Sequence, residues 1–271
     1  MVEKDYLRVL NLLYQVIEES KGIPVGRDNR LLEAEALATK FFFHSASALY
    51  LSRGTNIKDF PSIEISFFDP ASIHILARAA LETFLTFHYL FIAPKSGEEQ
   101  DFRYWAWQLG GLCERQKYPA SKPEYKRKQR DEKQLIDKLR KNLESNKIFK
   151  TLGKRQQNKI LKGKWRIESW RKIALDAGFD ELHASLFYSY LCEYAHSGSL
   201  STLQIRQATT KEVQKNLFQA SMEVIMIAIA NMIFSYCRLF PNGKKVLEKN
   251  TKVMDLAQIW IDIGRGQDKC L

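Results

Sequence analysis

The chain of 271 residues has little of the material from which turns and cross-links are made, with 13 Gly, 7 Pro and 4 Cys. So few turn-forming residues argue against a chain of many short strands. The four cysteines are far apart and form no C-x-x-C pair, so we expect reduced cytosolic thiols rather than a zinc site or a disulfide framework (Cys113, Cys192, Cys237 and Cys270). A P-loop, a G-x-G-x-x-G motif and an H-E-x-x-H motif are also absent, so neither a metal nor a cofactor is expected.

What the sequence has is a hydrophobic fraction of 45%, enough to bury a sizeable core. Its apolar residues recur mostly at helical spacing, and Ile63, Ile65 and Phe67 alternate as in an extended segment. We therefore predict an all-α, multi-helix bundle that forms a single domain over 1–271. Helices are expected over 4–19, 30–52, 70–92, 98–117, 124–145, 170–177, 181–196, 211–239 and 251–263, with 70–92, 181–196 and 211–239 at the centre.

The positive charge is concentrated in one block. The net charge is +11, and residues 114–172 alone contain 21 Lys or Arg and 7 Asp or Glu. We expect 114–168 to form a basic helical appendage that binds RNA or another polyanion. The alternative is a solvated helical hairpin with no such partner. The residues expected to contact nucleic acid are Lys126, Arg127, Lys128, Arg130, Lys154, Arg155, Lys164 and Arg166.

Two runs are apolar enough to be considered as membrane spans, which need about 20 apolar residues. The run 71–92 carries Arg78 and Glu82 near its middle, and the run 224–236 is short and interrupted by polar residues. The first ten residues do not have the charged-then-apolar order of a signal peptide. We therefore expect a cytoplasmic protein that is not inserted in a membrane.

One polar series crosses the apolar segment 70–92. His74, Arg78 and Glu82 are spaced four residues apart and share one side of the predicted helix. Charges removed from water cost several kcal/mol each unless they are paired, so these groups need partners. One interpretation is an intrahelical ion pair that holds a neighbouring element. The other is a polar cleft in which the pair orients a third group.

A second series lies in the segment 181–196. Tyr188, Cys192 and His196 are again four apart, and Glu193 precedes His196 by three residues. One hypothesis makes His196 a general acid/base and lets Arg78 stabilise phosphate charge in a metal-independent cleavage of RNA. In the alternative, His196 only caps the last helical carbonyls. The complete candidate catalytic set is His196, Arg78, Glu82, Tyr188 and Glu193, whereas Cys192 is expected to pack as a small hydrophobe.

Three segments carry a resemblance to a known family. The stretches are R-A-A-L-E at 78–82, W-R-I-E-S-W-R-K-I-A-L-D-A-G-F at 165–179 and Y-S-Y-L-C-E-Y-A-H at 188–196. Together they resemble a bacterial domain-of-unknown-function family, number 5677, over roughly residues 30–240. Cys192 stands where that family has Ser.

The resemblance also extends distantly to the HEPN helical proteins, many of which are RNases of toxin and phage-defence systems. Those enzymes carry Arg, four to six residues and then His on one helix. Residues 186–195 contain no Arg, so the resemblance implies that Arg78 supplies this group from another helix.

Three functions follow as alternatives. The first is an RNA-associated, HEPN-like protein of bacterial defence or stress that acts as a metal-independent ribonuclease. The second is a non-catalytic helical module whose basic face binds nucleic acid or a protein. The third is a scaffold whose apolar helices pair with a second copy to form a homodimer.

Overall fold

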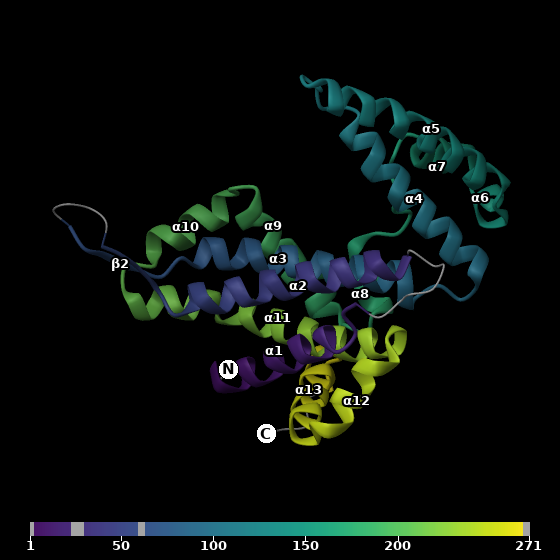
Figure 1. Ribbon diagram of the computed structural model, residues 1–271. Coiled ribbons are helices and arrows are strands. Elements are labelled where there is room, and N and C mark those ends of the chain that lie inside the picture. Colours follow the sequence, from purple (N-terminus) through teal and green to yellow (C-terminus); the bar gives the residue numbers. More distant parts are fainter. Residues whose placement is uncertain (1–2, 23–29, 59–62, 268–271) are drawn as a thin grey trace. The chain divides into compact units, whose positions relative to one another are not determined.

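The computed structural model describes residues 3–22, 30–58 and 63–267 (Figure 1). Nearly all of these residues are helical, which confirms the all-α, multi-helix fold. The described strands are β1 (Thr55–Ile57) and β2 (Ile65–Phe67), which pair antiparallel. The sequence predicts an extended stretch over 55–68, of which 59–62 lies outside the described residues, as does Cys270.

The chain divides into two compact units. Unit 1 consists of residues 1–88 and 170–271, and unit 2 of residues 89–169. The basic block 114–168 is therefore contained in unit 2, which starts earlier in the sequence. The division falls within a π-helical turn, η1 (His88–Ile92), and just before α8 (Trp170–Asp176).

Unit 1 contains the three helices expected at the centre. They are α3 (Pro70–Phe87), which continues into η1, the continuous pair η2 (Leu182–Phe187) and α9 (Tyr188–Ala195), and α11 (Lys211–Leu239). Around them lie α1 (Glu3–Glu18), α2 (Arg30–Ser52), α10 (Ser199–Gln207), α12 (Pro241–Lys249) and α13 (Thr251–Gly264).

The core of unit 1 is built on α3, which packs against α2, α9 and α11. The helix begins as expected from its sequence, because the Asp69 carboxylate accepts from the Ser72 amide at 3.0 Å and Pro70 occupies the first turn. Both Pro70–Ile92 and Lys211–Leu239 have the length and composition of a membrane span. In each, 67% of the most apolar window is buried within the fold, as is also typical of central helices of a soluble core.

Unit 2 contains α4 (Gly97–Arg115), α5 (Pro123–Ser145), α6 (Lys147–Thr151) and α7 (Lys154–Leu161). One narrow stripe of α5, including Ile136, Leu139 and Leu143, is buried against α4. The charged residue in this stripe, Glu132, is compensated by Arg115, whose Nη2 lies 2.7 Å from its carboxylate. A helix with one narrow buried face presents the remainder of its surface to solvent.

Candidate active site

The two polar series meet where α3 packs on α9. Arg78 and Glu82 project from α3 one turn apart, and Tyr188 and His196 come from the two ends of the α9 segment. All four side chains belong to unit 1. The structure therefore brings together four of the five residues of the predicted catalytic set.

The Arg78 guanidinium makes hydrogen-bond contacts with Glu82 and with His196. Its Nε donates to Oε1 of Glu82 at 3.0 Å, and its Nη1 lies 3.1 Å from Nε2 of His196. The same Oε1 of Glu82 accepts from the Tyr188 hydroxyl at 2.8 Å. Because Glu82 holds the Nε edge of the guanidinium, the Nη edge is presented toward His196.

The contact between Arg78 and His196 fixes the state of the imidazole. A guanidinium can only donate hydrogen bonds, so Nε2 of His196 must be the acceptor. The ring is then neutral, with its proton on Nδ1. His196 is exposed, whereas the side chain of Arg78 is only 20% exposed. A half-buried cation beside a neutral, solvent-accessible imidazole is an arrangement that can bind an anion and accept a proton.

The surroundings of Arg78 and Tyr188 hold each of these two side chains in one protonation state near neutral pH. Burial works against the charged form of Arg78, but the Glu82 carboxylate outweighs it and raises the pKa of the guanidinium. Burial, together with donation to Glu82, raises the pKa of the Tyr188 phenol. Arg78 therefore stays charged and Tyr188 stays a hydrogen-bond donor.

An unusual backbone conformation follows His196. Ser197 has φ of 53°, in the left-handed region that favours glycine, and it is the one described non-glycine residue with positive φ. The Gly198 amide then bonds to the Glu193 carbonyl at 2.7 Å, which closes the C-terminus of α9 in a Schellman-type turn. This conformation could not be predicted from the residue type, because Ser occupies the position where Gly is usual.

Glu193 lies outside the hydrogen-bonded cluster. Its carboxylate packs over Gly198, where an added Cβ would collide with Oε2 of Glu193. It makes no hydrogen bond or ion pair with another described side chain. The fifth member of the predicted catalytic set is thus close to His196 in sequence but is not joined to it.

His74 also lies outside the cluster, although it shares a face of α3 with Arg78. Its ring is fully buried, and the centroids of the His74 and Tyr194 rings are 3.9 Å apart. Its Nδ1 is hydrogen-bonded to the Ser221 hydroxyl at 2.5 Å. Burial lowers the pKa of His74 to about 4. His74 is therefore a neutral core residue, and Ser221 is the partner that sequence reasoning missed.

The predicted nucleic-acid contacts all lie in unit 2. Seven of them are exposed: Lys126, Arg127, Lys128, Arg130, Lys154, Arg155 and Lys164. Arg166 differs, because it is half-buried and donates to the Glu168 carbonyl at 2.6 Å. The Arg166 guanidinium is therefore engaged in a hydrogen bond within the chain.

The structure of α5 adds two cations to the predicted set of nucleic-acid contacts. Arg127, Arg130, Lys138 and Lys141 are exposed and lie on the face of α5 opposite its buried stripe. We call these four residues the α5 basic stripe. Lys138 and Lys141 are not among the predicted contacts, although their helical spacing from Arg127 and Arg130 places them on the same face.

Within the described parts of the chain, no three His, Cys, Asp or Glu side chains gather in a way that could hold a metal ion. The groups in the α3–α9 cluster are two donors, one carboxylate and one imidazole. Their chemistry is that of anion binding and proton transfer.

Comparison with known proteins shows which family the chain belongs to. No curated protein and no solved structure matches this chain. A family model matches residues 63–212, which is more than half of the chain and includes Arg78, Glu82, Tyr188 and His196. The chain therefore belongs to the family of unknown function DUF5677.

Proposed function

We propose that this protein binds RNA and cleaves it at the Arg78–His196 centre without the help of a metal ion. The observation that carries this proposal is the 3.1 Å contact between Arg78 Nη1 and His196 Nε2 at an exposed edge of unit 1. It places a cation for phosphate and a neutral base side by side.

Arg78 supplies the electrostatic part of the reaction. Its guanidinium has five N–H donors, of which Glu82 and His196 take two. The remaining Nη donors suit two oxygens of a phosphodiester, because the fork geometry of arginine matches phosphate. When the Arg78 guanidinium moves onto the phosphate, it no longer donates to His196, and the Nε2 lone pair of His196 is released.

The released imidazole supplies the base. His196 takes the proton of a ribose 2′-hydroxyl, and the 2′-oxygen then attacks the adjacent phosphorus. The bond from phosphorus to the 5′-oxygen breaks, and water protonates that oxygen. The hydroxide that this leaves takes the proton from His196, which restores the neutral imidazole, and the products carry a 2′,3′-cyclic phosphate and a 5′-hydroxyl. Glu82 and Tyr188 act as positioning residues, because they hold the guanidinium rather than the substrate.

A HEPN-like ribonuclease of bacterial defence or stress is the context that we propose for this chemistry. The all-α fold and the approach of an arginine to a histidine support it, with Arg78 coming from a second helix. The described cysteines are free thiols, which is in keeping with a cytoplasmic location.

The test is cleavage of a mixed-sequence RNA in excess chelator. The wild-type protein should cleave, His196→Ala should lose at least about 100-fold in rate, and Arg78→Lys should lose a similar factor. His183→Ala is the matched control, because His183 is a histidine of the same unit paired with a carboxylate, Asp180, at 2.7 Å. Equal rates for wild type and His196→Ala, or no cleavage by the wild type, would refute the catalytic proposal.

The second candidate is a non-catalytic module that binds a polyanion through unit 2. It is favoured by the α5 basic stripe, whose four cations point away from the core of unit 2. Binding through phosphate contacts makes log affinity fall linearly with log salt concentration. A titration with RNA at increasing salt should show this slope whether or not the RNA is cleaved, and an affinity independent of salt would exclude polyanion binding.

A further inference from the structure

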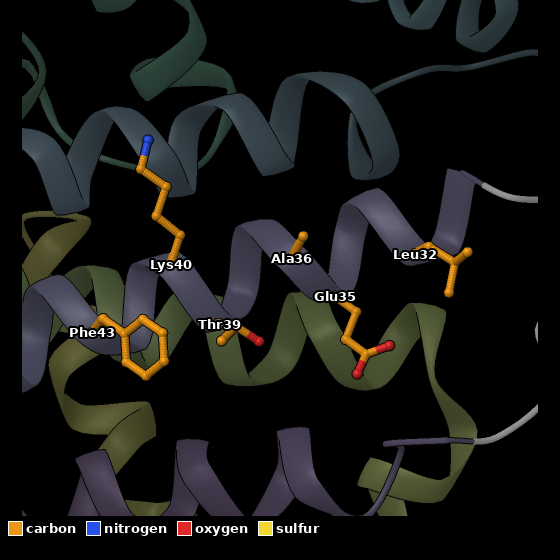
Figure 2. A pocket seen from close by; sticks show the side chains of 6 residues that line it. All are labelled: Leu32, Glu35, Ala36, Thr39, Lys40 and Phe43. Carbon is orange, nitrogen blue, oxygen red and sulfur yellow. The ribbon is translucent and has the colours of Figure 1, made fainter. Parts of the chain in front are cut away.

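The outward face of α2 exposes large apolar side chains, although the Phe43 ring lies beside Phe42 and the Tyr50 ring lies beneath Arg53. Leu32, Phe43 and Tyr50 are 51%, 60% and 68% exposed, while the opposite face of the helix is buried in unit 1. A shallow depression of about 400 Å³ lies along this face between Leu32 and Phe43 (Figure 2). Contiguous exposed apolar surface of this kind marks an interaction site.

The spacing on this face is that of a coiled-coil seam. Starting at Leu32, successive members are alternately four and three residues apart, as in the a and d positions of a heptad repeat. We call this set the α2 seam: Leu32, Ala36, Thr39, Phe43, Ala46 and Tyr50. The seam combines large side chains at Leu32, Phe43 and Tyr50 with small ones at the other three positions, so a facing helix can approach closely where the small residues lie.

Two opposite charges flank the seam. In Figure 2 the Glu35 side chain points to one side of α2 and the Lys40 side chain to the other. In the heptad register Glu35 takes position g and Lys40 the following position e, five residues later. Neither makes an ion pair with another residue of the described chain. In a parallel two-stranded pair, position g of one helix lies beside the next position e of the other, so these two charges are complementary across such a pair.

We propose that the α2 seam binds the α2 seam of a second copy of this chain in a parallel, two-fold symmetric pair. Each large seam residue then meets its own counterpart at the dimer axis. Glu35 of each protomer lies beside Lys40 of the other, so the pair of charges occurs twice. This interface is independent of the proposed reaction with RNA, and the oligomeric state can be measured without any substrate.

The test measures mass by sedimentation equilibrium over a range of protein concentrations. The wild type should be a dimer, and Phe43→Ser should be a monomer. Glu35→Lys should weaken the dimer at least about tenfold, because two attractions become two repulsions. The swap Glu35→Lys with Lys40→Glu should restore the wild-type affinity, since the charges again alternate across the pair.

The matched control is Ile259→Ser on α13, where Ile259 is 42% exposed and lies outside the seam. This change should leave the dimer unaltered, and circular dichroism should show the same helix content in all variants. A wild type that stays monomeric, a dimer that tolerates Phe43→Ser, or a charge swap that fails to restore affinity would each overturn the proposal.

Discussion

Arg78 Nη1 and His196 Nε2 are 3.1 Å apart, although the two residues are separated by 118 positions in the sequence. The packing of α3 on α9 makes this contact. Along α3, Glu82 meets Tyr188 and His74 meets Tyr194, so the two helices run in opposite directions where they touch. The polar cluster of Arg78, Glu82, Tyr188 and His196 therefore lies in the same α3–α9 interface as the buried His74.

The bond between Tyr188 and Glu82 should be measurable as a coupling energy. Tyr188→Phe removes the 2.8 Å hydrogen bond to Oε1, and we expect it to lower the free energy of unfolding by about 1 kcal/mol. In a Glu82→Leu background the same change should have little effect, because its acceptor is gone. Urea denaturation of the four proteins gives the coupling directly. Equal losses in both backgrounds would show that the bond does not contribute.

Ser197 should be a site where glycine is more stable than the native residue. Its φ of 53° costs an L-residue about 1 kcal/mol, and glycine adopts it freely. Ser197→Gly is therefore expected to raise the free energy of unfolding by up to about 1 kcal/mol, and Ser197→Val to lower it. Thermal unfolding followed by circular dichroism tests both. A destabilised glycine variant would contradict the assigned conformation.

His74 should make stability depend on pH. Its pKa is about 4 in the folded protein and about 6.5 when unfolded, so the unfolded chain binds the extra proton as pH falls. The stability contributed by the neutral ring is complete above about pH 6.5. It decreases from there toward pH 4, by up to about 3 kcal/mol in total.

The matched variant for this effect is His74→Gln, which keeps a group able to bond to Ser221. Urea unfolding of both proteins between pH 7 and pH 5 gives the difference in free energy at each pH. The wild type should lose stability relative to the variant as the pH is lowered. Parallel curves would show that His74 does not titrate on unfolding.

The α5 basic stripe should control the salt dependence of RNA binding. Changing Arg127, Arg130, Lys138 and Lys141 to Gln should reduce the slope of log affinity against log salt by about 0.7 for each lost phosphate contact. The control changes four exposed lysines of unit 1 to Gln, with the same loss of net charge: Lys244, Lys245, Lys249 and Lys252. If both variants alter the slope equally, the effect comes from net charge and not from the stripe.

Most helix boundaries could be predicted because local side chains set them. Thr209 and Glu212, for example, form a capping-box pattern that predicts a helix from 211, and α11 does begin at Lys211. The capping residue in the structure is the next one, Thr210, which accepts from the Val213 amide at 3.2 Å. The helices α10 and α12 were missed for a related reason. Gly198 and Pro241 follow the predicted helices 181–196 and 211–239, where each residue type is typical of a helix end. Each of them also starts the next helix, and proline is well suited to a first helical turn.

The candidate site was predictable in part. The four-residue spacing of Arg78 and Glu82 places them on one face of a helix, and that much is local. Which faces meet depends on tertiary packing, so the contact with His196 could be stated only as a hypothesis. The position of Glu193 was not predictable, because the turn at Ser197 brings Gly198 beneath its carboxylate.

The most direct test of the proposed reaction uses a DNA oligonucleotide that contains one ribonucleotide. In excess chelator the wild-type protein should cut this strand only after the ribonucleotide, and mass spectrometry should find a 2′,3′-cyclic phosphate on the 5′ fragment. His196→Ala should leave the strand intact. Cutting at deoxynucleotides, a product without the cyclic phosphate, or full cleavage by His196→Ala would contradict the role assigned to Arg78 and His196.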